Sequence, residues 1–143
     1  MSLNFVCYDY EADLPAEDYD AVLVYDALHH STDEGAVIRN VYKALGWGGI
    51  FITAEPGLGH SSQPGSIDAV KKFGTTEKDM EFARQLPLMR KAGFTEVRQY
   101  LRLSELSLVP VNFDAAAAQS AQFSSFALHT TKRGLTSIIV AAK

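Results

Sequence analysis

The feature that most constrains the fold is a short segment, residues 21–25 (AVLVY), that is apolar at almost every position. A strand that is apolar on both faces is typical of a sheet covered by helices on both sides. Apolar residues at helical spacing follow at Val37, Val41 and Ala44, and residues 50–54 form a second apolar strand. The sequence therefore predicts a strand-helix-strand unit, and such units connect parallel strands by a right-handed crossover.

Local signals mark both ends of the predicted helix. Ser31 and Glu34 have the spacing of a capping box, in which the side chain of each residue accepts a hydrogen bond from the backbone N–H of the other. Gly46 follows the last helical residue, where glycine commonly ends helices. We therefore expect the helix to begin at the Ser31–Glu34 motif and to end before the second strand.

The rest of the chain continues this alternation without an internal repeat or a linker, so we expect one domain over residues 1–143. Residues 55–76 are rich in glycine and proline and predict a long loop, which in compact domains is usually functional or mobile. Residues 102–113 are predicted to be irregular. Further strands are expected at residues 3–8, 94–101 and 137–142, and further helices at residues 67–73, 77–92 (interrupted at Pro87) and 114–126.

Composition excludes several classes of protein. The 143 residues are 47% hydrophobic, which suits a folded core, and no apolar run approaches the roughly 20 residues of a membrane span. The 13 Lys and Arg against 17 Asp and Glu give a net charge of -4, so binding to nucleic-acid phosphates is not expected. The start of the chain lacks the pattern of a signal peptide. A single cysteine, Cys7, cannot form an internal disulfide and favours a reducing, cytoplasmic location.

Several short motifs occur in an order that resembles a known family: Phe5-Val6-x-x-Asp9, Leu28-His29-His30, Leu45-x-x-Gly48-Gly49, Glu55-Pro56 and Lys91-Ala92-Gly93-Phe94. Together they resemble the C-terminal two-thirds of a class I S-adenosylmethionine-dependent methyltransferase. The resemblance implies an α/β fold: part of a doubly wound, mostly parallel seven-stranded sheet, with an antiparallel C-terminal strand and helices on both faces. The family's glycine-rich first strand-turn-helix has no counterpart here, so we expect an N-terminally truncated domain. The activity would be that of the parent protein, and the chain alone is expected to be impaired and to bind the cofactor poorly.

The resemblance also implies a cofactor, S-adenosylmethionine, and residues that would bind it. Asp9, next to Tyr10, matches the acid that accepts a hydrogen bond from the adenine amine, and its alternative role is that of a solvated loop acid. Asp26 and Ala27 follow the central strand and match the segment that lines the methionine part of the cofactor, although Asp26 could equally be a turn acid. His29 is assigned to the same cofactor site.

Three residues are candidates for contact with the methyl acceptor or for removal of its proton: His30, Glu55 and His60. A histidine suits proton removal because its pKa lies near neutrality. Structural roles for both adjacent histidines, and simple exposure for His60, remain open alternatives. A metal site of histidine and glutamate is conceivable from the same residues, but because no metal-ligand spacing such as H-x-x-x-H occurs, we expect no metal site.

A second interpretation is that the chain is a non-catalytic, Rossmann-like binding or interaction module. Without the family's first two strands, residues 21–25 would form an edge with unpaired backbone groups, which favours pairing with another chain. The first interpretation is thus a methyltransferase that acts on a small-molecule acceptor. The second is a module that forms a homodimer, or another association, through this edge. Neither involves a nucleic acid or a membrane.

Overall fold

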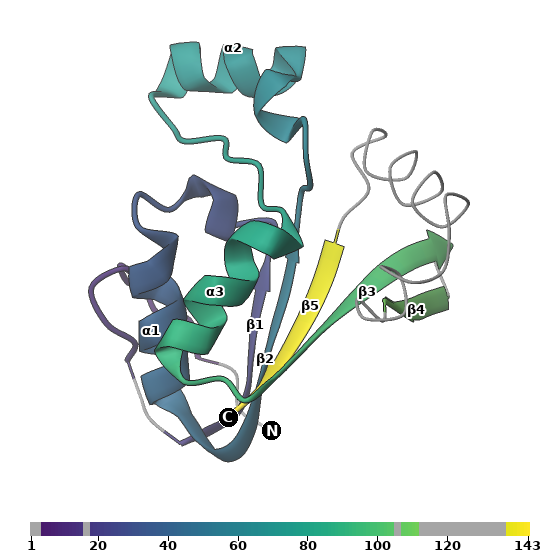
Figure 1. Cartoon of the computed structure of the whole chain (residues 1–143). Coiled ribbons are helices and arrows are strands. Elements are labelled where there is room, and N and C mark those ends of the chain that lie inside the picture. Colours follow the sequence, from purple (N-terminus) through teal and green to yellow (C-terminus); the bar gives the residue numbers. More distant parts are fainter. Residues whose placement is uncertain (1–3, 16–17, 105–106, 112–136) are drawn as a thin grey trace.

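The chain folds around one mixed sheet, seen in the computed structural model, which describes residues 4–15, 18–104, 107–111 and 137–143 (Figure 1). The sheet has five strands in the order β1-β2-β5-β3-β4. The strands are β1 (Tyr19–Tyr25), β2 (Leu45–Glu55), β3 (Glu96–Ser104), β4 (Ser107–Val111) and β5 (Ser137–Ala142). The helices are α1 (Glu34–Ala44), α2 (Pro64–Phe73) and α3 (Phe82–Ala92), with short 3-10 turns η1 (Leu28–His30) and η2 (His60–Ser62).

The predicted strand-helix-strand unit is confirmed. β1 and β2 pair in parallel, with Val22 opposite Phe51 and Val24 opposite Thr53, and α1 connects them. β5 lies between β2 and β3 and runs antiparallel to both, which confirms the antiparallel C-terminal strand. The two parallel strands end at the same edge of the sheet, so the loops that follow them lie next to each other.

The core lies between the sheet and two helices, α1 and α3, which pack against one face (Figure 1). β1 shows which face is covered: Val22 and Val24 pack against the core, whereas Leu23 and Tyr25 are 66% and 65% exposed. The helix cover that residues 21–25 predicted for both faces is thus seen on one face of β1 in the described part of the chain. The core residues are Leu28, Val37, Ile38, Val41, Leu45, Phe51, Met80, Phe82, Met89, Phe94, Ile139 and Ala141.

The helix predicted for residues 114–126 lies outside the described residues. No helix in the described part of the chain is both long and apolar enough to span a membrane.

The strand predicted at residues 3–8 is wrong for its described part, residues 4–8, which form no regular structure. Phe5, Val6 and Tyr8 are largely exposed there. A strand needs a neighbour for its backbone N–H and C=O groups, and no described strand lies beside this segment. Local β propensity alone did not determine its structure.

The predicted capping box is also wrong, because α1 begins two residues later than the motif requires. Asp33 is the N-cap, and its carboxylate accepts a hydrogen bond from the Ala36 backbone N–H at 3.0 Å. The Ser31 hydroxyl instead donates to the Leu28 carbonyl at 2.6 Å and closes η1. Glu34 is thereby free to pair with side chains outside its own helix.

Two further boundaries differ from the prediction. The helix predicted for residues 77–92 begins at Phe82 and continues through Pro87, because buried Phe82 and Met89 anchor it on both sides of the proline. The stretch predicted to be irregular contains β4, which pairs antiparallel with β3. The helix at residues 67–73 is confirmed and begins earlier, at Pro64, where proline suits the first helical turn.

Gly93 ends α3 in a conformation that only glycine adopts readily, with φ of 119°. A Cβ atom at this position would lie 2.6 Å from the Tyr42 ring. We expect Gly93→Ala to lower the free energy of unfolding by about 1–3 kcal/mol. Urea denaturation measures this change. Gly65→Ala in helix α2 is the matched control, since a Cβ atom there would meet nothing within 4 Å, and a comparable loss there would contradict the explanation.

Candidate functional site

The candidate site is built from the loops that follow β1 and β2. Asp26 leaves β1 with φ of 50°, a left-handed conformation, and its backbone N–H donates to the Ala54 carbonyl at 2.8 Å. The chain then forms η1, which carries both adjacent histidines, while β2 ends at Glu55. The carboxyl ends of neighbouring strands are where open α/β sheets bind ligands.

Glu55 joins these two loops. Its side chain is fully buried, and its carboxylate accepts hydrogen bonds from the backbone N–H groups of Ala27 (3.2 Å), Leu28 (2.9 Å) and His29 (3.3 Å). It also lies 2.7 Å from Nδ1 of His29. Because a carboxylate in this position satisfies four donors at once, Glu55 fixes the start of η1 and the orientation of the His29 ring.

His29 is held between carboxylates from three segments. Its side chain is only 3% exposed, with Asp26 at 3.9 Å from Nδ1 and Glu77 at 3.7 Å from Nε2. Burial alone would lower the pKa of His29, but the hydrogen bond and charge of Glu55, with the charges of Asp26 and Glu77, raise it. These carboxylates therefore favour the protonated, positively charged form of the ring.

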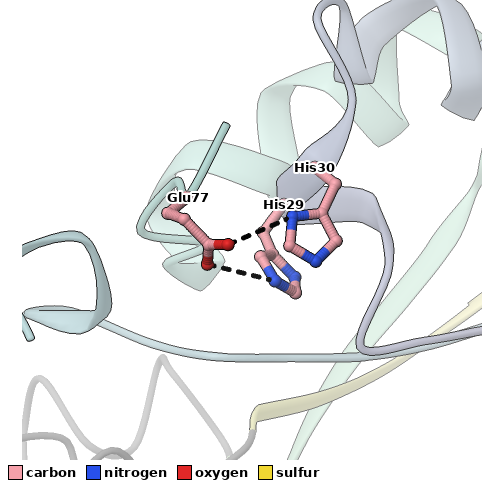
Figure 2. Close-up of side chains that lie close together, drawn as sticks. All are labelled: His29, His30 and Glu77. Atoms are coloured by element: carbon pink, nitrogen blue, oxygen red, sulfur yellow. Dashed lines mark ion pairs between the residues drawn. The ribbon is translucent and has the colours of Figure 1, made fainter. Parts of the chain in front are cut away.

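Glu77 is the site residue that the sequence interpretation missed. Its carboxylate lies among three imidazole rings: Nε2 of His60 is 2.8 Å away, Nδ1 of His30 is 3.5 Å away and Nε2 of His29 is 3.7 Å away. Figure 2 shows the carboxylate facing both His29 and His30. The Glu77 side chain is 8% exposed, so these rings are its main polar surroundings.

The backbone around Glu77 is fastened to η1. The Thr76 hydroxyl donates to the His29 carbonyl at 3.2 Å, and the Lys78 backbone N–H donates to the same carbonyl at 3.3 Å. The Thr76 carbonyl lies 2.8 Å from Nδ1 of His30. No local motif marks Glu77 in the sequence, because the site forms only when this returning loop meets η1.

Asp79 fixes the third histidine. Its carboxylate accepts hydrogen bonds from the backbone N–H groups of Gly59 at 2.9 Å and Ser61 at 2.7 Å. Burial alone would raise the pKa of Asp79, but these hydrogen bonds, with the charge of His60, lower it. The turn that carries His60 is thus held against the segment that carries Glu77.

Of the residues predicted to bind the cofactor, Tyr10 lies beside Ala27. Its hydroxyl donates to the Ala27 carbonyl at 3.2 Å. Burial, followed by the charges of Glu11, Glu55 and Asp9, raises the pKa of Tyr10. Asp9 is exposed and accepts a hydrogen bond from the Glu11 backbone N–H at 2.9 Å.

The predicted site residues therefore fall into two adjoining groups. Tyr10, Asp26 and Ala27 lie at the end of β1, with Asp9 in the exposed loop next to Tyr10. The second group, which we call the histidine cluster, consists of His29, His30, His60 and Glu77. Of these, His30 and His60 were predicted for the acceptor side and His29 for the cofactor site, and Glu77 was not predicted. The His29 and His30 ring centroids are 3.8 Å apart, and those of His29 and His60 are 5.0 Å apart. Glu55 contacts both groups, through the backbone N–H of Ala27 and through Nδ1 of His29.

Comparison with known proteins identifies the fold. A family model described as "Methyltransferase domain" matches residues 1–53. No curated protein sequence matches the chain significantly. The solved structures that are similar to this chain include three methyltransferases. An S-adenosylmethionine-dependent methyltransferase from Thermotoga maritima has 19% identity and a TM-score of 0.56, and the match covers 93% of this chain and 60% of that one.

The second, an S-adenosylmethionine-dependent methyltransferase from Mesorhizobium loti, has 16% identity, a TM-score of 0.60, and coverage of 95% and 67%. The third, phosphoethanolamine N-methyltransferase 2 of Haemonchus contortus in complex with S-adenosyl-L-methionine, has 16% identity, a TM-score of 0.58, and coverage of 94% and 36%. The chain thus spans 60% of the Thermotoga protein and about a third of the Haemonchus enzyme.

Proposed function

We propose that this chain, which has part of the class I methyltransferase fold, belongs to a protein that transfers a methyl group from S-adenosylmethionine to a small-molecule acceptor. The observation that carries this proposal is the pairing of β1 and β2 in parallel, with the candidate residues gathered in the loops at their carboxyl ends. A reducing, cytoplasmic location is part of the proposal and rests on the use of a single cysteine.

The residues at the end of β1 fit the cofactor in part. Asp26 has an exposed carboxylate on a left-handed turn, where it could meet the methionine amine, with Ala27 next to it. Asp9 keeps a carboxylate available in the neighbouring loop for the adenine amine. His29 fits less well, because its buried ring is bonded to Glu55; we assign it to positioning the loop instead.

The bound cofactor supplies a methyl group on a positively charged sulfur. What the chain must add is orientation of the acceptor, exclusion of water and removal of a proton from the acceptor. His30 suits proton removal best among the described histidines, since its side chain is 41% exposed while those of His29 and His60 are more buried. Its Nδ1 lies against the Thr76 carbonyl, which only accepts hydrogen bonds, so in the neutral ring Nε2 carries the free lone pair.

Isothermal titration calorimetry with S-adenosylhomocysteine tests the proposal. Because the chain lacks the family's glycine-rich turn, we expect weak but saturable binding, and Asp26→Ala should weaken it further because the mutation removes the exposed carboxylate at the end of β1. Glu96→Gln, on the exposed surface of β3, is the control and should leave binding unchanged. Absence of heat at millimolar ligand would contradict a cofactor site and favour the non-catalytic interpretation.

The edge of the sheet supports a second proposal, association through β1. Within the described part of the chain, β1 pairs only with β2, and Leu23 and Tyr25 are exposed. An edge strand with unpaired backbone groups and apolar side chains favours pairing with a second copy. Size-exclusion chromatography with light scattering should show a dimer at micromolar concentration.

A variant separates this edge from other apolar surface. Leu23→Lys places a charge on the exposed face of β1 and should lower the dimer fraction. Phe73→Lys, at an exposed phenylalanine in α2, is the matched control and should not. A monomer in the wild-type protein, or equal effects of both changes, would contradict association through β1.

A further inference from the structure

We propose that the histidine cluster binds a divalent transition-metal ion through His29, His30 and Glu77. Each of the three residues offers one ligand atom, and these atoms lie within 4.8 Å of one another. Figure 2 shows the Glu77 carboxylate facing both imidazole rings. The expectation of no metal site rested on spacing along the sequence, whereas these ligands come from two segments that meet only in the fold.

The distances suit a zinc ion. Zinc binds imidazole nitrogen and carboxylate oxygen at about 2.0–2.2 Å in tetrahedral geometry, so two ligand atoms on one ion lie roughly 3.4 Å apart. The His29 Nε2 to Glu77 Oε2 distance is 3.7 Å, and the His30 Nδ1 to Glu77 Oε1 distance is 3.5 Å. Completing the site therefore requires side-chain rotations, and if His30 binds through Nδ1, this nitrogen must exchange its hydrogen bond to the Thr76 carbonyl, 2.8 Å away, for the ion.

Hydrogen bonds orient both of the buried ligands as they do in known metal sites. Glu55 lies 2.7 Å from Nδ1 of His29 and accepts a hydrogen bond from that nitrogen. The lone pair of the neutral ring is therefore on Nε2, which faces Glu77. In the described part of the chain, this Nε2 makes no hydrogen bond. His60 lies 2.8 Å from Oε2 of Glu77 and holds the carboxylate in turn. Carboxylates bonded to the far nitrogen of a ligating histidine fix its tautomer and increase its basicity.

A second arrangement of possible ligands, Asp26, His29 and Glu55, is less suitable. The Glu55 carboxylate already accepts hydrogen bonds from three backbone N–H groups and meets Nδ1 of His29. Binding a cation there would break the contacts that hold η1. The geometry therefore points to the Nε2 side of His29, where Glu77 lies.

The donor set also indicates which ions would bind. Two imidazoles and one carboxylate match zinc and related transition metals, whereas calcium and magnesium prefer sites made of oxygen ligands. Three protein ligands leave one tetrahedral position open, as in catalytic zinc sites. If the proposed methyl transfer is correct, an oxygen or sulfur atom of the acceptor could occupy this position. The ion would then favour the deprotonated acceptor, and His30, as a ligand of the ion, would no longer act as the free base.

Calorimetric titration of the chain, freed of affinity tags, with Zn²⁺ tests the site. We expect one ion per chain, and Co²⁺ should give the intense visible absorption of a tetrahedral complex. Glu77→Gln and His30→Ala should each lower the zinc affinity by about 10-fold or more, and Glu96→Gln should not. Mg²⁺ and Ca²⁺ should give no heat.

Two features of the design keep the result clear. Circular dichroism of the metal-free variants shows whether they fold, and His30→Ala alters a partly exposed ring that the core does not need. Zinc is titrated without S-adenosylhomocysteine, and S-adenosylhomocysteine is titrated with a chelator present, so that either proposal can fail without the other. Absence of zinc binding by the wild-type chain, or equal binding by a folded His30→Ala variant, would overturn the metal site.

Discussion

Replacing Glu55 by alanine is expected to lower the free energy of unfolding by about 3–5 kcal/mol, as removal of one member of a buried, charged hydrogen-bonded group typically does. The change leaves the backbone N–H groups of Ala27, Leu28 and His29 without their acceptor. It also leaves the His29 ring buried without its carboxylate partner. Urea denaturation followed by circular dichroism measures the loss.

Two variants serve as controls for this prediction. Glu55→Gln keeps the shape and one acceptor oxygen, so we expect a smaller loss, about 1.5–3 kcal/mol, from the weakened charged hydrogen bonds. Glu96→Gln removes an exposed carboxylate that pairs with Arg98 on the surface and should change stability by less than about 1 kcal/mol. If Glu55→Ala were as stable as the wild-type chain, the described role of Glu55 at the start of η1 would be wrong.

The second large effect concerns Glu34, which links α1 to the loop before α3 and to α3 itself. Its carboxylate accepts a hydrogen bond from Nζ of Lys78 at 2.6 Å and from Nε of Arg84 at 2.7 Å. Burial alone would raise the pKa of Glu34, but these hydrogen bonds and the charge of Lys78 lower it below its ordinary value of 4.5. We expect Glu34→Gln to cost about 1.5–3 kcal/mol of stability near neutral pH.

The lowered pKa fixes how this loss depends on pH. Because the folded chain binds the Glu34 proton less tightly than the unfolded chain does, the ion pairs stabilise the fold fully above the ordinary carboxyl pKa. That contribution is lost as the pH falls through the lower, folded-state pKa. The stability difference between wild type and Glu34→Gln should therefore be largest near neutral pH and shrink in acid, as urea titrations at several pH values would show. A difference that grew in acid would contradict the assignment.

The sequence predicted the centre of the fold because its signals there are local and agree with one another. The apolar run at residues 21–25, the helical spacing of Val37 and Val41 and the apolar run at residues 50–54 each specify one element. Their parallel pairing follows from the helical crossover that connects them. The antiparallel position of β5 came from the family resemblance and could not be inferred from local pattern.

Elements that depend on distant partners could not be predicted in the same way. Residues 4–8 have the composition of a strand but no described strand beside them, so they remain irregular. Asp33 rather than Ser31 caps α1, because Ser31 is already bonded to Leu28. In both cases the available hydrogen-bond partners, rather than the local sequence preference, determined the structure.

The candidate site shows the same division. His29, His30, Glu55 and His60 were identified by their place after predicted strands, and the fold brings all four together. Glu77 carries no sequence signal, since a single acid in a polar loop is usually solvated. It is part of the site only because the returning loop is fastened over η1 by backbone hydrogen bonds.

The most direct test of the central claim, that the carboxyl ends of β1 and β2 form a cofactor site, is a nuclear magnetic resonance titration of the ¹⁵N-labelled chain with S-adenosylhomocysteine. The structure leads us to expect saturable shifts in the amide signals of Tyr10 and residues 26–28, where the two loops meet. Shifts confined to other parts of the chain, or no shifts at millimolar ligand, would contradict the claim.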